Sequence, residues 1–139
     1  VLPANQNNCA DEVGERNDWV EIYNKGTSAV DLAGCSLTDD TASPRKSVLP
    51  EGLTIEAGAA LLLWGDGTPE QGATHLAFKL QAKTEQVVLY DPDEREVDSY
   101  RWTDATSDVS FARVPDGTGA YVRCATPTCG TPNGSSCGQ

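Results

Sequence analysis

The sequence contains no methionine, one histidine and only two phenylalanines among its 139 residues. It has no apolar stretch near the roughly 20 residues that span a bilayer, so we expect no membrane insertion. Basic residues are few: 10 Lys and Arg stand against 21 Asp and Glu, which gives a net charge of −11. Because affinity for nucleic acids depends on cations that neutralise phosphates, we expect no nucleic-acid partner.

Helical periodicity is scarce as well. Short alternating or apolar runs are separated by Gly, Pro, Asn and Asp, a pattern typical of an all-β sandwich or barrel. The spacing predicts roughly seven to nine short antiparallel strands, which matches an immunoglobulin-like β-sandwich. In the run over residues 19–23, Val20 and Ile22 face one side of the expected strand, and Trp19 and Tyr23 face the other.

These runs lie within residues 1–124, which we interpret as one sandwich domain. Residues 125–139 are rich in Thr, Pro, Gly and Ser, and predict a C-terminal tail or linker pinned only by its cysteines. The sequence starts at Val1 without a targeting segment, so we expect an excised domain or a processed piece of a larger protein.

The cysteines favour an oxidising compartment, because five in so short a chain are typical of disulfide-bonded extracytoplasmic proteins. We therefore expect an extracellular, cell-surface or periplasmic location. The odd number leaves one thiol free or paired elsewhere. We favour a Cys9–Cys35 bridge with one further bridge among the tail cysteines, and a bridge from Cys9 to the tail is the alternative. The five disulfide candidates are Cys9, Cys35, Cys124, Cys129 and Cys137.

Catalytic patterns are missing. The sequence has no Gly-x-Ser-x-Gly nucleophile motif for which the single histidine, His75, could act as the base. We expect His75 on a surface loop. Carboxylates are plentiful, but a small sandwich rarely provides the cleft that glycoside hydrolysis needs. We therefore expect no enzyme activity and no catalytic residues.

Three acidic loops invite a calcium hypothesis, but none follows the EF-hand pattern. Aspartates also cap turns through their own backbone, and we expect that use here. No cofactor is therefore expected, with calcium as the alternative. The three candidate loops carry Asp39 and Asp40; Asp91, Asp93 and Glu94; and Asp11, Glu12 and Glu15.

Aromatic rings on a flat sheet can stack on sugars. We expect Trp64 and Trp102 in the core, whereas Trp19 and Tyr23 are candidates for surface binding because they lie opposite Val20 and Ile22. Trp19 is the ring that we most expect to be exposed.

Several sequence segments resemble segments of the lamin-tail domain and occur in the same order as in that family. They include Asp-Trp-Val-Glu-Ile-Tyr-Asn at 18–24, Val-Asp-Leu-Ala-Gly at 30–34 and Leu-Thr-Asp-Asp at 37–40. The resemblance continues through residues 53–58, 62–64, 76–80, 85–92 and 98–99, and closes with Thr-Pro-Thr-Cys-Gly at 126–130 and Asn133. It implies an immunoglobulin-like sandwich, and bacterial relatives are accessory modules of secreted or surface proteins. The cysteines point to this bacterial, extracytoplasmic branch.

Two departures from the family matter. Cys35 stands where the family commonly carries Trp, and so small a side chain would leave a void unless something else fills it. The family's first strand usually begins before the position of Val1, which would leave a strand edge short. Gly34 and Gly58 are expected at turns with positive φ.

Together these features predict a non-catalytic interaction or scaffold module of a larger secreted or cell-surface protein. It would recognise a protein or glycan partner through sheet faces, an edge strand or end loops. An open strand edge would also permit a homodimer. The alternative function is a carbohydrate- or calcium-dependent adhesion module.

Overall fold

The computed structural model describes residues 1–134 and 137. These residues form ten strands and one 3-10 turn: β1 (Trp19–Tyr23), β2 (Val30–Asp31), β3 (Ser36–Thr38), β4 (Ser47–Val48), β5 (Thr54–Ile55), β6 (Ala60–Trp64), η1 (Pro69–Gln71), β7 (Thr84–Tyr90), β8 (Glu96–Thr103), β9 (Ser110–Val114) and β10 (Ala120–Cys124). The prediction of an all-β fold is confirmed. The number of strands exceeds the predicted seven to nine because several are only two residues long.

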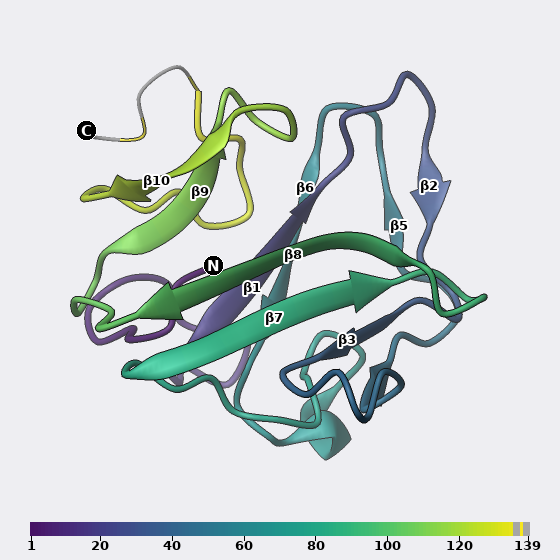
Figure 1. Cartoon of the computed structure of the whole chain (residues 1–139), viewed down its shortest axis with the longest axis horizontal. Helices are drawn as coiled ribbons and strands as arrows, with labels where there is room; N and C mark the ends of the chain where they lie inside the picture. The colour runs from purple at the N-terminus through teal and green to yellow at the C-terminus, as the bar shows by residue number, and fades with distance from the viewer. Residues whose placement is uncertain (135–136, 138–139) are drawn as a thin grey trace.

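The strands make two layers of an immunoglobulin-like sandwich. One layer is the antiparallel sheet β4-β3-β7-β8, and the other contains the pairs β1-β6, β2-β5 and β10-β9. Figure 1 shows β7 and β8 crossing in front of β1 and β6. No helix in the described part of the chain is long and apolar enough to cross a membrane.

The first two residues connect β1 to β9. Leu2 exchanges backbone hydrogen bonds of 2.8 and 3.1 Å with Trp19 of β1. Val1 exchanges backbone hydrogen bonds with Phe111 of β9, both of 2.8 Å. The N-terminus therefore lies between β1 and β9, as Figure 1 shows. Its first two residues form a short extended segment that pairs with both strands.

The core lies between the layers. Val20 points inward as its alternation predicts, and it shares one buried cluster with Trp102 of the opposite layer and Phe111 of β9. Burying a large apolar side chain of this kind contributes about 1.5–3 kcal/mol. Further members of this core are Leu32, Leu37, Leu49, Ile55, Leu63, Leu76, Phe78, Leu80 and Val87.

A second cluster overturns the expectation that Trp19 is exposed. Its side chain is only 2% exposed and packs with Leu2 and Trp64, close to Cys9 and Cys129. Alternation had separated the two faces of β1 correctly. It could not show that the N-terminal residues and the C-terminal tail cover the second face.

The disulfides join Cys9 to Cys129 and Cys124 to Cys137, and Cys35 is free. The favoured Cys9–Cys35 bridge is therefore wrong, whereas the alternative bridge from Cys9 to the tail is confirmed, as is one bridge among the tail cysteines. Cys9 pairs with the tail because it lies over the outer face of β1, where the tail arrives.

The tail is held by more than its cysteines. The backbone N–H of Gly130 donates to Glu21 Oε2 at 2.6 Å. The backbone and side-chain amides of Asn133 donate to Asp116 Oδ1 at 2.8 and 2.9 Å. These contacts tie the tail to β1 and to the turn after β9.

Gly34 and Gly58 adopt φ values of +78° and +72°, as predicted for their turns. A residue with a Cβ is strained at such positive φ values, so these two positions favour glycine.

Candidate functional site

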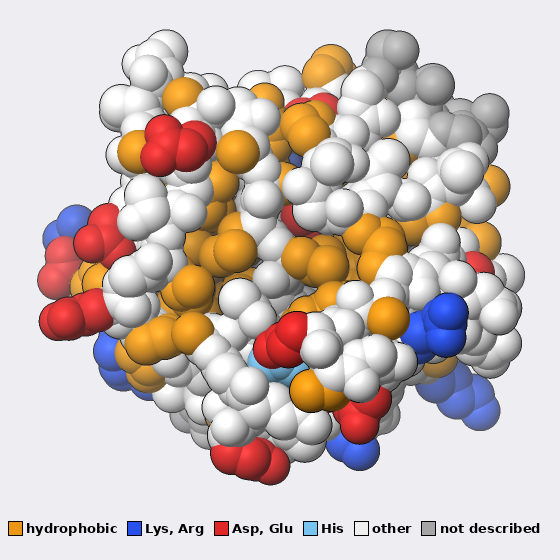
Figure 2. Space-filling model, turned by 180° about the vertical axis from the view of Figure 1, so that it is seen from behind, with side chains coloured by type: hydrophobic (Ala, Val, Ile, Leu, Met, Phe, Trp, Pro, Cys, Tyr) orange, Lys and Arg blue, Asp and Glu red, His pale blue; other side chains and the backbone are white. Residues whose placement is uncertain are grey.

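The main candidate site is a cavity of about 540 Å³ that lies between β1 and β9 and reaches down to the opposite layer. Apolar side chains from both layers line it, among them Ile22, Leu37, Leu89 and Phe111. Figure 2 shows hydrophobic side chains gathered around a hollow on the face seen from behind. A concave apolar site with a few polar groups is the usual form of a binding site.

Val1 and Leu2 form a short extended segment that pairs with β9 and β1 beside the cavity. Among the described residues, no other strand lies between β1 and β9. Val1 lines the cavity, as do Asp116 and Gly117 of the turn after β9.

Cys35 lines this cavity with a free, half-buried thiol. A cavity at this position agrees with the void expected from a small side chain where the family carries Trp. Burial raises the pKa of the thiol, and the nearby carboxylates of Asp91 and Asp31 raise it further. Since the thiolate is the reactive form, this environment does not favour a nucleophile.

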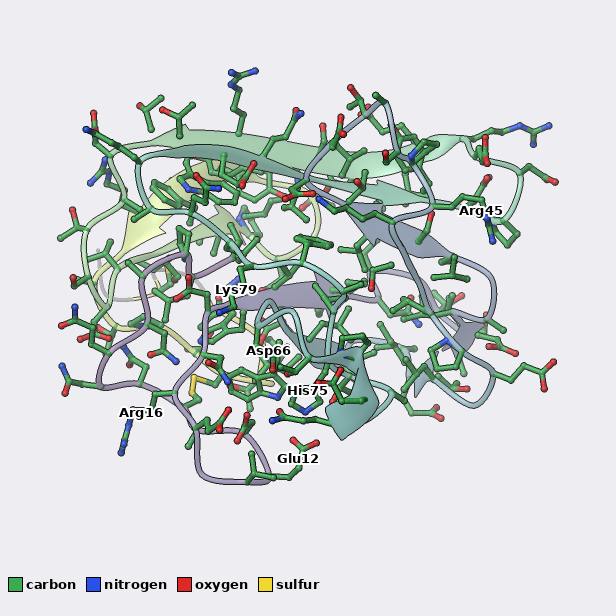
Figure 3. All side chains as sticks on the ribbon, turned by 90° about the horizontal axis from the view of Figure 1, so that it is seen from below. Glu12, Arg16, Arg45, Asp66, His75 and Lys79 are labelled. Carbon is green, nitrogen blue, oxygen red and sulfur yellow. A yellow bond between two sulfur atoms is a disulfide. The ribbon has the colours of Figure 1, made fainter. Side chains whose placement is uncertain are left out.

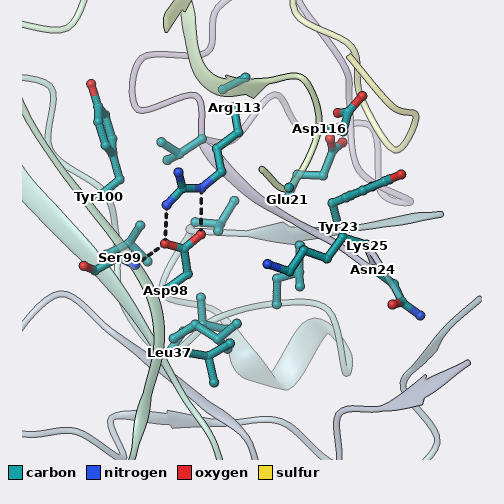
Figure 4. Close-up of a pocket in the computed structure, with 18 of the residues that line it drawn as sticks. Glu21, Tyr23, Asn24, Lys25, Leu37, Asp98, Ser99, Tyr100, Arg113 and Asp116 are labelled. Carbon is teal, nitrogen blue, oxygen red and sulfur yellow. Dashed lines mark hydrogen bonds and ion pairs between the residues drawn. The ribbon is translucent and has the colours of Figure 1, made fainter. Parts of the chain in front are cut away.

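An ion pair crosses the cavity from one layer to the other. Arg113 of β9 donates from Nε and from one terminal nitrogen to the two oxygens of Asp98 on β8, at 3.1 and 2.7 Å. Its guanidinium also lies 4.4 Å from the ring centre of Tyr121. Burial raises the pKa of Asp98, but the hydrogen bonds from Arg113 and Ser99 outweigh it, and the net pKa is lowered. Figure 4 shows this pair as dashed lines.

Glu21 marks the acidic side of the cavity. Burial raises the pKa of its carboxyl to about 7, despite the hydrogen bond from Gly130, and the nearby charge of Asp116 raises it as well. Figure 4 shows Glu21 and Asp116 to one side of the ion pair, with Tyr23 close by. Tyr23, one of the two predicted binding residues, is half-buried and lines the cavity.

A separate polar cluster surrounds His75, and it corrects the expectation of a surface histidine. The His75 side chain is fully buried. Its Nδ1 lies 2.5 Å from Asp66 Oδ2, and its Nε2 lies 2.7 Å from Glu12 Oε1. Figure 3 shows Asp66 and Glu12 on either side of the ring. Burial lowers the pKa of His75, but the two carboxylates outweigh it, so the net pKa is raised.

This cluster was missed by sequence reasoning because its members come from distant segments. Glu12 belongs to the N-terminal loop, whereas Asp66 follows β6 and His75 follows η1. The Gly-Asp-Gly sequence at 65–67 gives no indication that its Asp turns inward toward a histidine.

Asp11, Asp66 and His75 each offer a ligand atom, and these atoms lie within 4.8 Å of one another. Calcium prefers six to eight oxygens, and this set includes an imidazole nitrogen. The carboxylates are also engaged within the protein. Asp11 Oδ1 accepts the N–H groups of Val13 and Glu15 at 3.0 and 2.8 Å, and Asp66 Oδ1 accepts that of Thr68 at 3.0 Å.

The other acidic loops use their carboxylates in turns or ion pairs. Asp39 accepts a hydrogen bond from the Lys46 ammonium at 2.6 Å. Asp40 accepts the backbone N–H of Ala42 at 2.9 Å. Asp91 accepts those of Asp93 and Arg95, both at 2.9 Å.

Comparison with protein families agrees with this architecture. The family model described as Lamin Tail Domain matches residues 3–104, which is more than half of the chain. The chain belongs to the Lamin Tail Domain family. Members are immunoglobulin-like, in agreement with the sandwich described above. No curated protein and no solved structure matches the chain.

The family match ends before β9, so this lamin tail domain departs from the expectation that the resemblance covers nearly the whole chain. The closing motif at 126–130 lies outside the matched residues. The main cavity therefore lies between a matched strand, β1, and an unmatched one, β9.

Proposed function

We propose that this lamin tail domain is a non-catalytic interaction module of a larger secreted or cell-surface protein, of the bacterial type. The observation that carries the proposal is the cavity between β1 and β9, with its apolar floor and an acidic side formed by Glu21 and Asp116. The two disulfides support the extracytoplasmic location, since such bonds persist in oxidising compartments.

The groups that line the cavity suit binding better than chemistry. The Cys35 thiol has a raised pKa, and Arg113 and Asp98 are engaged with each other. His75 lies outside the cavity, and each of its ring nitrogens is hydrogen-bonded to a carboxylate. A catalytic site would need a nucleophile within reach of a base.

The aromatic side chains favour a protein partner over a glycan. Trp19 is buried, and the rings of Tyr100 and Tyr121 lie 4.1 Å apart, packed against each other. A sugar-binding platform needs an open ring face. Tyr23 is the remaining candidate from the sequence, and it lies at the cavity.

The test is a binding array that carries extracellular proteins and glycans, probed with the labelled domain. Tyr23→Ala alters the cavity, and Tyr90→Ala is the matched control because Tyr90 is also half-buried but lies outside the cavity. Protein binding that Tyr23→Ala abolishes and Tyr90→Ala preserves is the expected result. Binding to glycans alone would favour the adhesion alternative. An equal loss of protein binding in both variants would show that the cavity is not the binding site.

A further inference from the structure

The polar cluster around His75 combines a buried imidazole with carboxylates from two separate segments. One ligand atom each from Asp11, Asp66 and His75 lies within 4.8 Å of the other two. Asp11 belongs to the N-terminal loop, whereas Asp66 and His75 lie on either side of η1. The side chains of Asp66 and His75 are buried, and Figure 3 shows Asp66 beside the ring. The fold thus brings one nitrogen donor and two oxygen donors together.

Each of the two aspartates uses one carboxylate oxygen to hold its own position. Asp11 Oδ1 accepts two backbone N–H groups of its loop, and Asp66 Oδ1 accepts one from the segment that follows it. The second oxygen is left for the cluster: Asp66 Oδ2 faces His75, and Asp11 Oδ2 receives a long 3.3 Å hydrogen bond from the Asn17 amide. Outer hydrogen bonds of this kind orient carboxylates that bind metal ions.

The His75 ring is held in the same manner. Its Nδ1 faces Asp66 Oδ2 at 2.5 Å, and its Nε2 faces Glu12 Oε1 at 2.7 Å. A histidine that binds a metal ion through one nitrogen usually donates its other N–H to a carboxylate, which fixes the ring and its tautomer. Glu12 can accept the Nε2 proton in this way. The Nδ1 atom is then directed toward the two aspartates.

The charges of this cluster are unbalanced. Asp11, Glu12 and Asp66 each contribute a carboxylate, and within the described residues none of them forms an ion pair with Lys or Arg. His75 supplies at most one positive charge. Asp11 and Asp66 are largely removed from water, and a buried carboxylate is costly unless an opposite charge compensates it. A divalent cation would provide that compensation.

We propose that Asp11, Asp66 and His75 form a binding site for Zn²⁺, with Glu12 as the positioning residue at the far ring nitrogen. Imidazole and carboxylate together suit Zn²⁺, whereas Ca²⁺ and Mg²⁺ prefer oxygen ligands alone. Four-coordinate zinc accepts three protein ligands and one water. The ion displaces the proton between His75 Nδ1 and Asp66 Oδ2 into solvent, and it ties the N-terminal loop to the sandwich.

Asp11 distinguishes this site from a purely structural link. Glu12 and Asp66 suffice to join the N-terminal loop to His75, because each accepts a hydrogen bond from one ring nitrogen. A further carboxylate within 4.8 Å of Asp66 and His75 adds repulsion between like charges unless a cation lies among them. The zinc site is also separate from the cavity between β1 and β9, so it does not depend on the function proposed above.

The probe is zinc chloride, titrated at about pH 7.5 into the intact, oxidised, tag-free and metal-free domain, and followed by calorimetry and NMR. His75 is the single histidine of the chain, so its ring signals are identified directly. Asp66→Asn and Asp11→Asn each remove a ligand charge and keep an oxygen that can accept the backbone N–H groups. Asp91→Asn is the matched control, because Asp91 Oδ1 also accepts two backbone N–H groups, in a loop outside the cluster.

The expected result is one Zn²⁺ per chain, with a change in the His75 ring signals that is complete at one equivalent. Asp66→Asn and Asp11→Asn should each weaken zinc binding by about tenfold or more, and Asp91→Asn should leave it unchanged. Glu12→Gln keeps an oxygen that can accept the Nε2 proton, so it should bind zinc more tightly than Glu12→Ala. Equal zinc affinity of Asp66→Asn and Asp91→Asn, or no zinc binding, would overturn the proposal.

The unaltered domain decides the matter if the variants do not fold. Zinc that binds without changing the His75 ring signals would lie elsewhere on the acidic surface, and this outcome would overturn the site. Calcium that changes the ring signals as strongly as zinc would overturn the assignment to Zn²⁺. Protein binding on the array described above, carried out in chelator, tests the interaction module separately, so a failure of the zinc site leaves that proposal standing.

Discussion

Asp66 and His75 form a buried pair that holds the N-terminal loop against the sandwich. His75 Nδ1 lies 2.5 Å from Asp66 Oδ2, and the opposite ring nitrogen lies 2.7 Å from Glu12 Oε1. A ring between two carboxylates is favoured in its doubly protonated form, because both nitrogens can then donate. The histidine thus serves as a structural link between segments 63 residues apart.

Replacing this link should give a pH-dependent loss of stability. The pKa of folded His75 is raised, so its contribution is complete below the unfolded value of about 6.5 and is lost as pH rises through the folded value. We expect His75→Gln to lower the free energy of unfolding by about 1–3 kcal/mol at acidic pH and by less at alkaline pH. Urea unfolding of both proteins at about pH 5.5 and about pH 9 measures this, and a loss independent of pH would contradict it.

Neutralising Glu21 should stabilise the domain. The folded carboxyl keeps its proton up to about pH 7, whereas its ordinary pKa is 4.5. The folded state therefore binds more protons between these values, and this group makes stability fall as pH rises through them. Glu21→Gln should raise the free energy of unfolding by roughly 1–3 kcal/mol above pH 7 and have little effect below about pH 4.5.

Denaturant unfolding across this pH range measures the effect of Glu21→Gln. The amide oxygen of Gln can still accept the Gly130 N–H, so the tail contact is retained. The group also faces Asp116 and the amino group of Val1. A destabilised variant above pH 7 would show that the Glu21 charge is favourable where it lies.

Removing the disulfide between Cys9 and Cys129 should uncover Trp19. This bridge closes a loop across 120 residues, and its loss should lower stability by about 2–5 kcal/mol. The tail would also leave the outer face of β1, so tryptophan fluorescence should shift to the red in the Cys9→Ser, Cys129→Ser double variant. Cys35→Ser is the control, because that thiol is free and should leave the emission unchanged. Unchanged emission in the double variant would show that the tail stays in place without the bridge.

The ion pair between Asp98 and Arg113 should be measurable by a double-mutant cycle. Its two-point geometry at 3.1 and 2.7 Å is stronger than a single surface contact. We expect a coupling of about 1–2 kcal/mol between Asp98→Asn and Arg113→Lys at neutral pH. Because the pKa of Asp98 is lowered, this contribution should be lost as pH falls through the folded value. Additive effects of the two changes at neutral pH would contradict the prediction.

Calcium should not stabilise the domain. The aspartates of the acidic loops cap turns or pair with Lys46, and the cluster at His75 includes a nitrogen donor. We expect the same melting temperature in chelator and in millimolar calcium. An increase with calcium that Asp66→Asn abolishes would establish a metal site at the His75 cluster instead.

The amino-acid sequence alone determined the all-β class and most strand positions. The alternation at Trp19–Tyr23 placed Val20 in the core, and the turns at Gly34 and Gly58 were located correctly. These features depend on side-chain periodicity and on backbone conformations that each segment expresses locally. The resemblance to lamin-tail domains was likewise carried by short strings, and the family match confirmed it.

Only the tertiary structure decided which distant segments meet. Cys9 pairs with Cys129 rather than Cys35, Trp19 is covered by the tail, and the buried His75 meets Glu12. The cavity between β1 and β9 arises in the same way, from strands more than 80 residues apart in sequence. Local periodicity indicates on which face of a strand a side chain lies. Whether water, a disulfide or another segment covers that face depends on the path of the whole chain.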